Sequence, residues 1–164
     1  MKHVLLTGAV QIGKSTALKR FLVKHGYCAD GYRTYWKDKD TLYIAPFDGS
    51  EGVCAAVTEK GVRRALPEGF EYGASLIENS GKKQLIVFDE LGRLEQCSDR
   101  FMNAVFEKLK GEKPVVGVIK KEKNPFLDKI RENPNVIILE VTEDNRNRIP
   151  EEIEKYILIE KPPY

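Results

Sequence analysis

The chain has 164 residues, with 27 Lys and Arg against 25 Asp and Glu, so its formal net charge is only +2. This near balance gives no electrostatic case for binding nucleic acid or an anionic membrane surface. A chain of this length buries about 70% of its unfolded surface, and we expect residues 1–164 to form a single domain without disulfide or metal staples.

The first motif in the chain is a phosphate-binding loop. The short apolar run Val4–Leu6 leads directly into Gly8–Ser15, which has the spacing G-x-x-x-x-G-K-[ST], and an apolar-periodic helix follows and ends near Gly26. Glycines let backbone N–H groups converge on phosphate oxygens, and the helix N-terminus adds partial positive charge. The alternative interpretation is a chance glycine turn between a strand and a helix. The residues expected to hold the nucleotide are Gly8, Ala9, Val10, Gln11, Ile12, Gly13, Lys14, Ser15 and Thr16.

The segment that follows this helix predicts a β-hairpin. Residues 31–36 and 41–47 are rich in aromatic and β-branched residues and are separated by a charged turn, so we expect a hairpin over about 31–47. Its aromatic side chains would either form core or offer a surface on which a base stacks. Residues 48–70 contain four glycines and one proline and give the weakest structural signal. Such an irregular segment is either a lid over the phosphate site or a solvated surface loop.

The rest of the chain alternates between helix and strand patterns. In chain order, we expect a helix over 71–79, a strand over 84–89, a helix from Ser98 to about 110, a strand over 114–119, a helix over 124–132, a strand over 135–141, a helix beginning near Pro150, and a tail over 161–164. This alternation predicts an α/β fold with a mostly parallel sheet, helices on both faces and the hairpin as an addition. Ligand sites in such sheets lie at the carboxyl ends of the strands.

The strand over 84–89 leads into two adjacent carboxylates, Asp89 and Glu90. An Asp at this position supports Mg²⁺ in P-loop enzymes, so we expect Asp89 to hold the metal through its water shell, with Ser15 offering its hydroxyl. Glu90 would face the γ-phosphate and polarise the attacking water. Hydrolysis needs such a group, whereas a kinase needs an acceptor pocket, so the pair favours hydrolysis. The alternative is a solvated turn at a strand end.

Phosphoryl transfer also needs positive charge around the γ-phosphate. Lys14 is expected to reach the β- and γ-phosphates. Among the arginines, Arg93 is the nearest in sequence to the acidic pair and is the candidate catalytic arginine, although each arginine is otherwise a surface residue. The remaining candidates are Arg100, Arg146 and Arg148, together with Lys120, Lys121 and Lys123, which would line the phosphate mouth or lie in a solvated loop.

Several motifs together resemble those of the THEP1 nucleoside-triphosphatase family. DELGRLE at 89–95 resembles the family signature D-E-[IL]-G-x-[ML]-E, VTEDNRN at 141–147 resembles its V-T-x-x-N-R segment, and ADGYRT at 29–34 resembles its D-G-[FY]-x-T. The strand end at 117–119, with the lysine-rich loop after it, also fits. These motifs occur in the family's order and cover most of the chain except residues 37–79.

The resemblance implies a RecA-like P-loop fold and slow, Mg²⁺-dependent hydrolysis of ATP, GTP and other nucleoside triphosphates. It also implies that Asn145 and Arg146 lie near the nucleotide. The chain departs from the family in two places. Val10 and Gln11 stand where the family usually has proline and a further glycine, and the hairpin after Gly31 lacks the usual glycine- and arginine-bearing continuation.

Together these patterns predict a nucleoside-triphosphatase that cleaves the β–γ bond, with nucleoside triphosphates as its partners and no protein partner indicated. A small-molecule kinase is a second hypothesis, because residues 48–70 would be free to close over an acceptor. A nucleotide-gated binding subunit is a third. Cys28, Cys54 and Cys97 read as reduced thiols, no apolar run is long enough to span a membrane, and the first motif leaves no room for a signal peptide. We therefore expect a cytoplasmic protein.

Overall fold

The computed structural model describes residues 2–157, and the tail expected over 161–164 lies outside them. The strands are β1 (His3–Thr7), β2 (Ala29–Asp38), β3 (Thr41–Pro46), β4 (Val53–Glu59), β5 (Val62–Ala65), β6 (Leu85–Leu91), β7 (Val115–Ile119) and β8 (Val136–Glu140). The helices are α1 (Lys14–His25), α2 (Pro67–Glu78), α3 (Asp99–Lys110), α4 (Pro125–Glu132) and α5 (Ile149–Tyr156), with a 3₁₀ turn, η1 (Leu94–Cys97), before α3.

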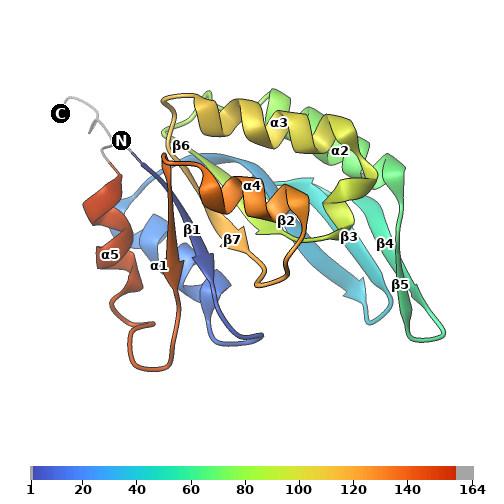
Figure 1. The fold of residues 1–164 in the computed structure, drawn as a ribbon, viewed down its shortest axis with the longest axis horizontal. Helices are drawn as coiled ribbons and strands as arrows, with labels where there is room; N and C mark the ends of the chain where they lie inside the picture. Colours follow the sequence, from blue (N-terminus) through green and yellow to red (C-terminus); the bar gives the residue numbers. More distant parts are fainter. Residues whose placement is uncertain (1, 158–164) are drawn as a thin grey trace.

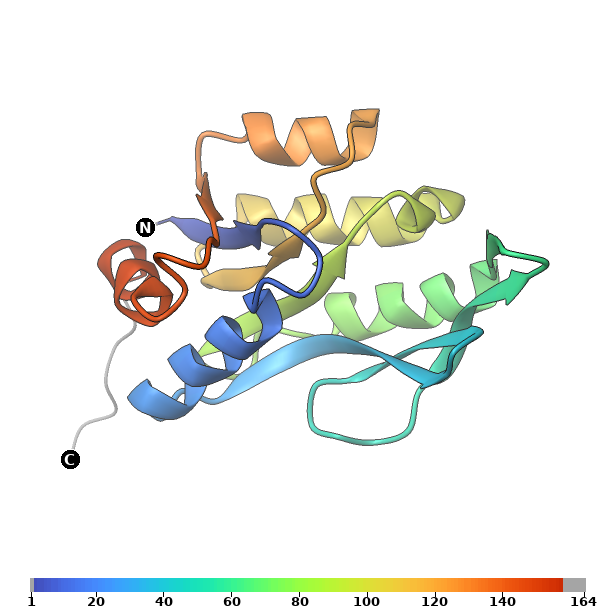
Figure 2. The same cartoon turned by 90° about the horizontal axis from the view of Figure 1, so that it is seen from below.

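All of these strands join one eight-stranded sheet in the order β5-β4-β3-β2-β6-β7-β1-β8. The five strands from β2 to β8 in this order run parallel, and β3, β4 and β5 extend the sheet as an antiparallel meander. Figures 1 and 2 show the helices distributed over both faces of this sheet. The predicted α/β fold, with its mostly parallel sheet and added hairpin, is therefore confirmed.

Two apolar cores, one on each face of the sheet, hold the helices in place. The buried faces of α2, α3 and α4 pack in one core around residues such as Phe70, Phe101 and Phe126. The buried faces of α1 and α5 pack in the other, around residues such as Phe21 and Ile153. The parallel strands are apolar on both faces because both are covered, as expected for a sheet of this kind.

Residues 53–65 differ from the sequence-based expectation of an irregular segment, because they form the hairpin β4–β5. The turn at its tip has Lys60 and Gly61 both in left-handed conformation, at φ 50° and 76°. Positive φ at both central residues is the arrangement of a type I′ turn, for which Asn-Gly and Asp-Gly are the usual signals. Lys-Gly is a weaker signal for such a turn. Three of the four β5 residues are exposed, so the strand also lacks a clear alternation of apolar and polar residues that would predict it. That this segment moves as a lid stays a prediction.

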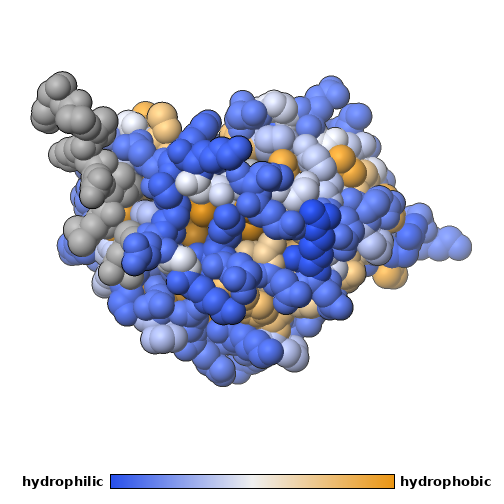
Figure 3. Space-filling view, turned by 90° about the horizontal axis from the view of Figure 1, so that it is seen from above, coloured by the Kyte–Doolittle hydropathy of each residue, from blue (hydrophilic) through white to orange (hydrophobic). Residues whose placement is uncertain are grey.

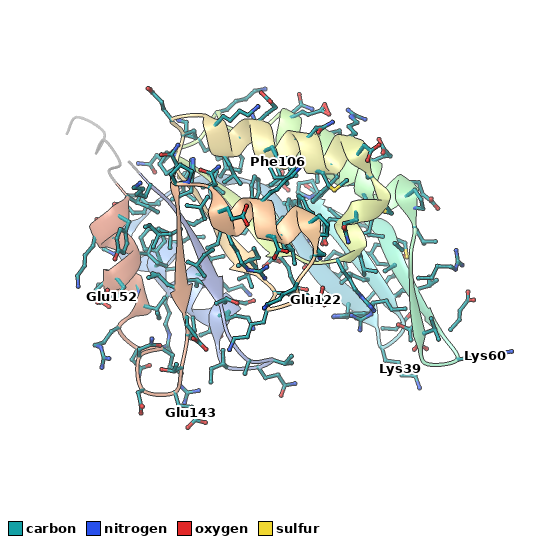
Figure 4. All side chains as sticks on the ribbon, in the orientation of Figure 1. Lys39, Lys60, Phe106, Glu122, Glu143 and Glu152 are labelled. Carbon is teal, nitrogen blue, oxygen red and sulfur yellow. The ribbon has the colours of Figure 1, made fainter. Side chains whose placement is uncertain are left out.

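The carboxyl ends of the parallel strands share one edge of the sheet, where the loops after β1, β6, β7 and β8 gather with the tips of the β2–β3 and β4–β5 hairpins. In Figure 4, Glu122, in the loop after β7, is drawn near the middle of the molecule, and Glu143, in the loop after β8, lies at the lower edge. Lys39 and Lys60 lie further along it, at the tips of the β2–β3 and β4–β5 hairpins. The backbone N–H of Thr58 donates to the carbonyl of Asp40 at 2.7 Å, which holds these two hairpins together.

The surface seen in Figure 3 is mostly hydrophilic, with hydrophobic areas between the polar side chains. Among residues 2–157, the exposed large apolar side chains are Val10, Val23, Trp36 and Val62, which come from four separate segments. Within residues 2–157, none of the helices is long and apolar enough to cross a membrane.

Candidate active site

The phosphate loop joins β1 to α1 and adopts the strained backbone that its motif requires. Gly8 and Gly13 have φ of 145° and 109°, values that side chains with a Cβ rarely adopt. A Cβ on Gly8 would also lie 2.7 Å from the carbonyl oxygen of Val141, so only glycine fits there. Gln11 also has positive φ, at 61°, at a position where a glycine would be relaxed. The Nζ atom of Lys14 donates to the carbonyl oxygens of Gly8 and Ala9, both at 2.8 Å.

A cavity of about 660 Å³ opens beside this loop at the carboxyl edge of the sheet. Most of the residues expected to bind the nucleotide or to act on it line this cavity. They are Gly8, Val10, Gln11, Gly13, Lys14, Ser15, Thr16, Glu90 and Arg93. Ala9 contributes its carbonyl to Lys14, while Ile12 packs against the core beneath α1. The structure thus brings the phosphate loop and the end of β6 together around one space.

Glu90 lies in the cavity wall opposite the phosphate loop. Its Oε1 atom lies 3.2 Å from the Nζ atom of Lys120, and its backbone carbonyl accepts a hydrogen bond from the Tyr32 hydroxyl at 2.7 Å. These contacts fix both the main chain and the side chain of Glu90. Partial burial lowers the pKa of Lys14, an effect that the negative charge of Glu90 opposes. The ammonium of Lys14 and the carboxylate of Glu90 therefore act on each other electrostatically across the cavity.

Asp89 lies beside the cavity rather than in its wall, because adjacent residues of a strand point to opposite faces. Its Oδ2 atom accepts a hydrogen bond from the backbone N–H of Thr34 at 2.7 Å. Burial raises the pKa of Asp89, and the hydrogen bond from Thr34 opposes this rise. Among residues 2–157, only Thr34 donates to this carboxylate, so Oδ1 keeps its lone pairs for another ligand.

These donors fit Mg²⁺ held mainly by a nucleotide. Mg²⁺ prefers oxygen ligands and is usually bound through one or two carboxylates, waters and substrate phosphates. The Ser15 hydroxyl lines the cavity, and Asp89 supplies an oxygen beside it. In the described part of the chain, no three His, Cys, Asp or Glu side chains are grouped so as to hold a metal ion without such phosphates.

The candidate arginines differ in whether they line the cavity. Arg93 lines the cavity, and its backbone N–H donates to the Glu122 carboxylate at 3.0 Å. Arg100 instead donates through Nε to Glu78 at 2.6 Å and joins α3 to α2. Arg148 donates to the carbonyl of Asp144 at 3.3 Å, within its own turn. Of the arginines weighed for the transition state, Arg93 is therefore the one in the cavity wall.

Asn145 and Arg146 lie on the β8 side of the phosphate loop. The Asn145 side chain accepts from the N–H of Thr142 and donates to the carbonyl of Glu140, both at 2.8 Å, so it shapes the turn after β8. Arg146 lies next to the loop, with its Cδ atom 3.8 Å from the position that a Cβ would take on Gly13. Neither residue lines the cavity.

Lys120 and Lys121 line the cavity, whereas Lys123 does not. Their loop after β7 is held by Arg131, whose Nη2 atom donates to the carbonyls of Lys120 at 2.5 Å and of Glu122 at 2.7 Å. The role of Arg131 was not predictable from the sequence, because an arginine near the end of a helix is typical of an ordinary surface residue.

Glu95 is a further cavity residue that sequence analysis assigned no role. It lies in η1, is 7% exposed, and its Oε2 atom accepts from the backbone N–H of Gly92 at 2.8 Å. Burial raises the pKa of Glu95 to about 7. The only signal in the sequence is its place as the last residue of DELGRLE.

The wall of the cavity away from the phosphate loop was also missed in part. Trp36, one of the aromatic residues of the predicted hairpin, lines the cavity and is 44% exposed, so it is not core. The guanidinium of Arg63 lies over its ring, 4.5 Å from the centroid. Arg63 comes from β5, in the segment expected to be irregular.

A phosphate loop after the first strand of a parallel sheet, facing an acidic strand end two strands away, defines a P-loop nucleotide-binding protein. Comparisons with known proteins narrow this class. Residues 50–154 match the model of a family described as NTPase. The nucleoside-triphosphatase THEP1 of Thermotoga sp. strain RQ2 is 33% identical over 161 residues, which cover 92% of each chain. The corresponding THEP1 of Thermotoga maritima is 32% identical with the same coverage.

The chain therefore belongs to this NTPase family, as the resemblance of its motifs implied. Two solved structures share its fold. THEP1 from the hyperthermophile Aquifex aeolicus has a TM-score of 0.76 and 24% identity, covering 93% of this chain and 96% of that one. A human cancer-related nucleoside triphosphatase has a TM-score of 0.74 and 24% identity, covering 94% and 96%.

Proposed function

We propose that this protein hydrolyses the β–γ bond of nucleoside triphosphates with Mg²⁺, giving the diphosphate and inorganic phosphate. The observation that carries the proposal is the placement of Lys14 and Glu90 in one cavity at the carboxyl edge of the sheet. Lys14 supplies a positive charge for phosphate, and Glu90 supplies a carboxylate for water. The names of the similar THEP1 proteins support the same activity.

In this mechanism Lys14 exchanges its bonds to the Gly8 and Ala9 carbonyls for phosphate oxygens when a triphosphate binds. The backbone N–H groups between Gly8 and Thr16 cradle the phosphates, and the N-terminus of α1 adds its partial charge. Arg93 balances charge that develops at the mouth of the cavity. We propose that Arg146 and the turn shaped by Asn145 lie toward the nucleoside.

Glu90 orients a water for in-line attack on the γ-phosphorus and accepts its proton, while the bond from that phosphorus to the β–γ bridging oxygen breaks. The ion pair with Lys120 and the hydrogen bond from Tyr32 hold Glu90 in place for this step. Ser15 and Asp89 would hold Mg²⁺, which neutralises charge on the phosphate oxygens.

Phosphate release from ATP, GTP, CTP and UTP with Mg²⁺ tests the proposal. Glu90→Gln should lower the rate by about 10² or more, because a positioned base contributes 10²- to 10⁴-fold, and should leave nucleotide binding intact. Glu107→Gln is the matched control, because Glu107 is an exposed carboxylate of α3 that pairs with Lys110 and does not line the cavity. If Glu90→Gln releases phosphate at the parent rate, Glu90 is not the base.

A further inference from the structure

The cavity extends past the place where a triphosphate ends. If Glu90 faces the γ-phosphate, as the proposed function requires, the nucleoside lies at the other end of the phosphate chain. Across the sheet edge, the loop carrying Arg146 follows β8 on one side of β1, whereas β6, which carries Glu90, and then β2, which carries Trp36, lie on the other. The nucleoside therefore points toward Arg146, and the wall around Trp36 remains beyond the γ-phosphate.

That wall is built by one face of the antiparallel meander. Thr34 pairs with Ile44 and Trp36 pairs with Leu42 across β2 and β3, so these four side chains share a face. All four line the cavity, as does Phe70 from α2. These side chains form a largely apolar surface, and the indole ring of Trp36 lies at its side.

Two charged groups complete the wall. Arg63 lies over the ring of Trp36, and among residues 2–157 it has no carboxylate within ion-pair distance, unlike its neighbour Arg64, which pairs with Glu59. Glu95 is buried yet lines the same cavity, and η1, which carries it, packs against β5, which carries Arg63. Its second carboxylate oxygen, Oε1, accepts no hydrogen bond from the described residues.

We propose that this wall is a second ligand site, which binds a nucleoside monophosphate next to the γ-phosphate of the triphosphate. The three recognition groups match its three parts. A flat base stacks on Trp36 above the apolar surface, the phosphate pairs with Arg63, and an amino or hydroxyl group donates to Glu95. This inference rests on the proposed function for the position of the γ-phosphate.

Trp36 makes the site directly observable, because it is the only tryptophan in the chain. The experiment records Trp36 emission while AMP, GMP, CMP or UMP is added to the full-length protein saturated with Mg²⁺ and the β,γ-imido analogue of ATP. We expect the analogue alone to leave the emission nearly unchanged and at least one monophosphate to quench it with a saturable dependence.

Arg63→Ala and Arg64→Ala form the matched pair, because both remove a guanidinium from β5 and only Arg63 faces Trp36. A charge-assisted hydrogen bond is worth about 1.5–3 kcal/mol, so Arg63→Ala should weaken monophosphate binding by about 10- to 100-fold. Arg64→Ala should bind as the parent does.

Three outcomes would overturn the inference. The first is that no monophosphate quenches the emission, and the second is that both variants bind the monophosphate equally well. The third is that the triphosphate analogue quenches the emission by itself and that the monophosphates compete with it. The last would place the triphosphate base on Trp36. Phosphate release by the parent from ATP alone is measured separately, so a failure of the proposed function is not confused with a failure of this one.

Discussion

Replacing Glu95 by glutamine removes the most buried carboxylate of the cavity without changing its shape. Burial raises the pKa of Glu95 to about 7, from an ordinary value of 4.5. Glutamine keeps an oxygen that can accept from the N–H of Gly92, as Oε2 does at 2.8 Å in the parent, and it does not titrate. The variant therefore isolates the cost of ionising a carboxyl group in this position.

The sign of the effect follows from where the proton resides. Between pH 4.5 and about 7 the folded protein keeps the Glu95 proton that the unfolded chain has released, so the free energy of unfolding falls as the pH rises. The loss is complete above about pH 7. At about 1.4 kcal/mol per pH unit, the gap between the two pKa values is worth about 3 kcal/mol. The glutamine variant does not lose this stability as the pH rises, because its side chain does not ionise.

Urea unfolding of parent and variant at about pH 4.5 and about pH 8.5 measures the difference. We expect similar stabilities at the lower pH and a variant about 3 kcal/mol more stable at the higher pH, or about 6–12 °C in midpoint temperature. Glu107→Gln, which removes an exposed carboxylate of α3, should change the difference by less than about 0.5 kcal/mol. A gain for Glu95→Gln that does not depend on pH would refute the reasoning.

Three further changes test the phosphate loop and the sheet. Lys14→Ala should lower affinity for the imido analogue of ATP by at least about tenfold in calorimetry, and affinity equal to that of Lys24→Ala, which removes a distant lysine, would contradict its role. Gln11→Gly should be neutral or stabilising by up to about 1 kcal/mol, because it removes the strain of a side chain at φ 61° but raises the entropy of the unfolded chain. A clearly lower midpoint temperature in thermal unfolding would argue against strain at this residue. Gly31→Ala should destabilise by about 3 kcal/mol or more, because its Cβ would lie 2.2 Å from the carbonyl oxygen of Val87, and an unchanged urea midpoint would show that β2 and β6 can separate there.

The parallel half of the fold was predictable because its signals are local. Each signal lies within a few residues of the element that it predicts. These signals are the loop glycines, the unbroken apolar strands and the caps of α3 and α4. Ser98 and Asn124, where these two helices were expected to begin, cap them by accepting hydrogen bonds from the N–H groups of Phe101 and Leu127. The fold therefore followed from short-range rules.

The far wall of the cavity was not predictable in the same way. Arg63 and Glu95 face one cavity only because β5 and η1 pack together, and nothing within either segment indicates this. The partner of Asp89 is equally distant in sequence, because its Oδ2 atom accepts from the N–H of Thr34 in β2, more than fifty residues earlier. Contacts between distant segments depend on how the sheet is assembled, so periodicity alone does not reveal them.

The division of the sheet into a parallel and an antiparallel half has an evolutionary consequence. Lys14, Glu90 and Lys120 come from the start of α1, the end of β6 and the loop after β7, whereas Trp36 lies near the end of β2 and Arg63 comes from the meander that follows β2. Relatives can therefore differ in the segment from Trp36 to Arg63 while keeping Lys14, Glu90 and Lys120 unchanged. Exchanging this segment between relatives should change which molecule binds beside the γ-phosphate. It should leave the residues around Lys14 and Glu90 unchanged.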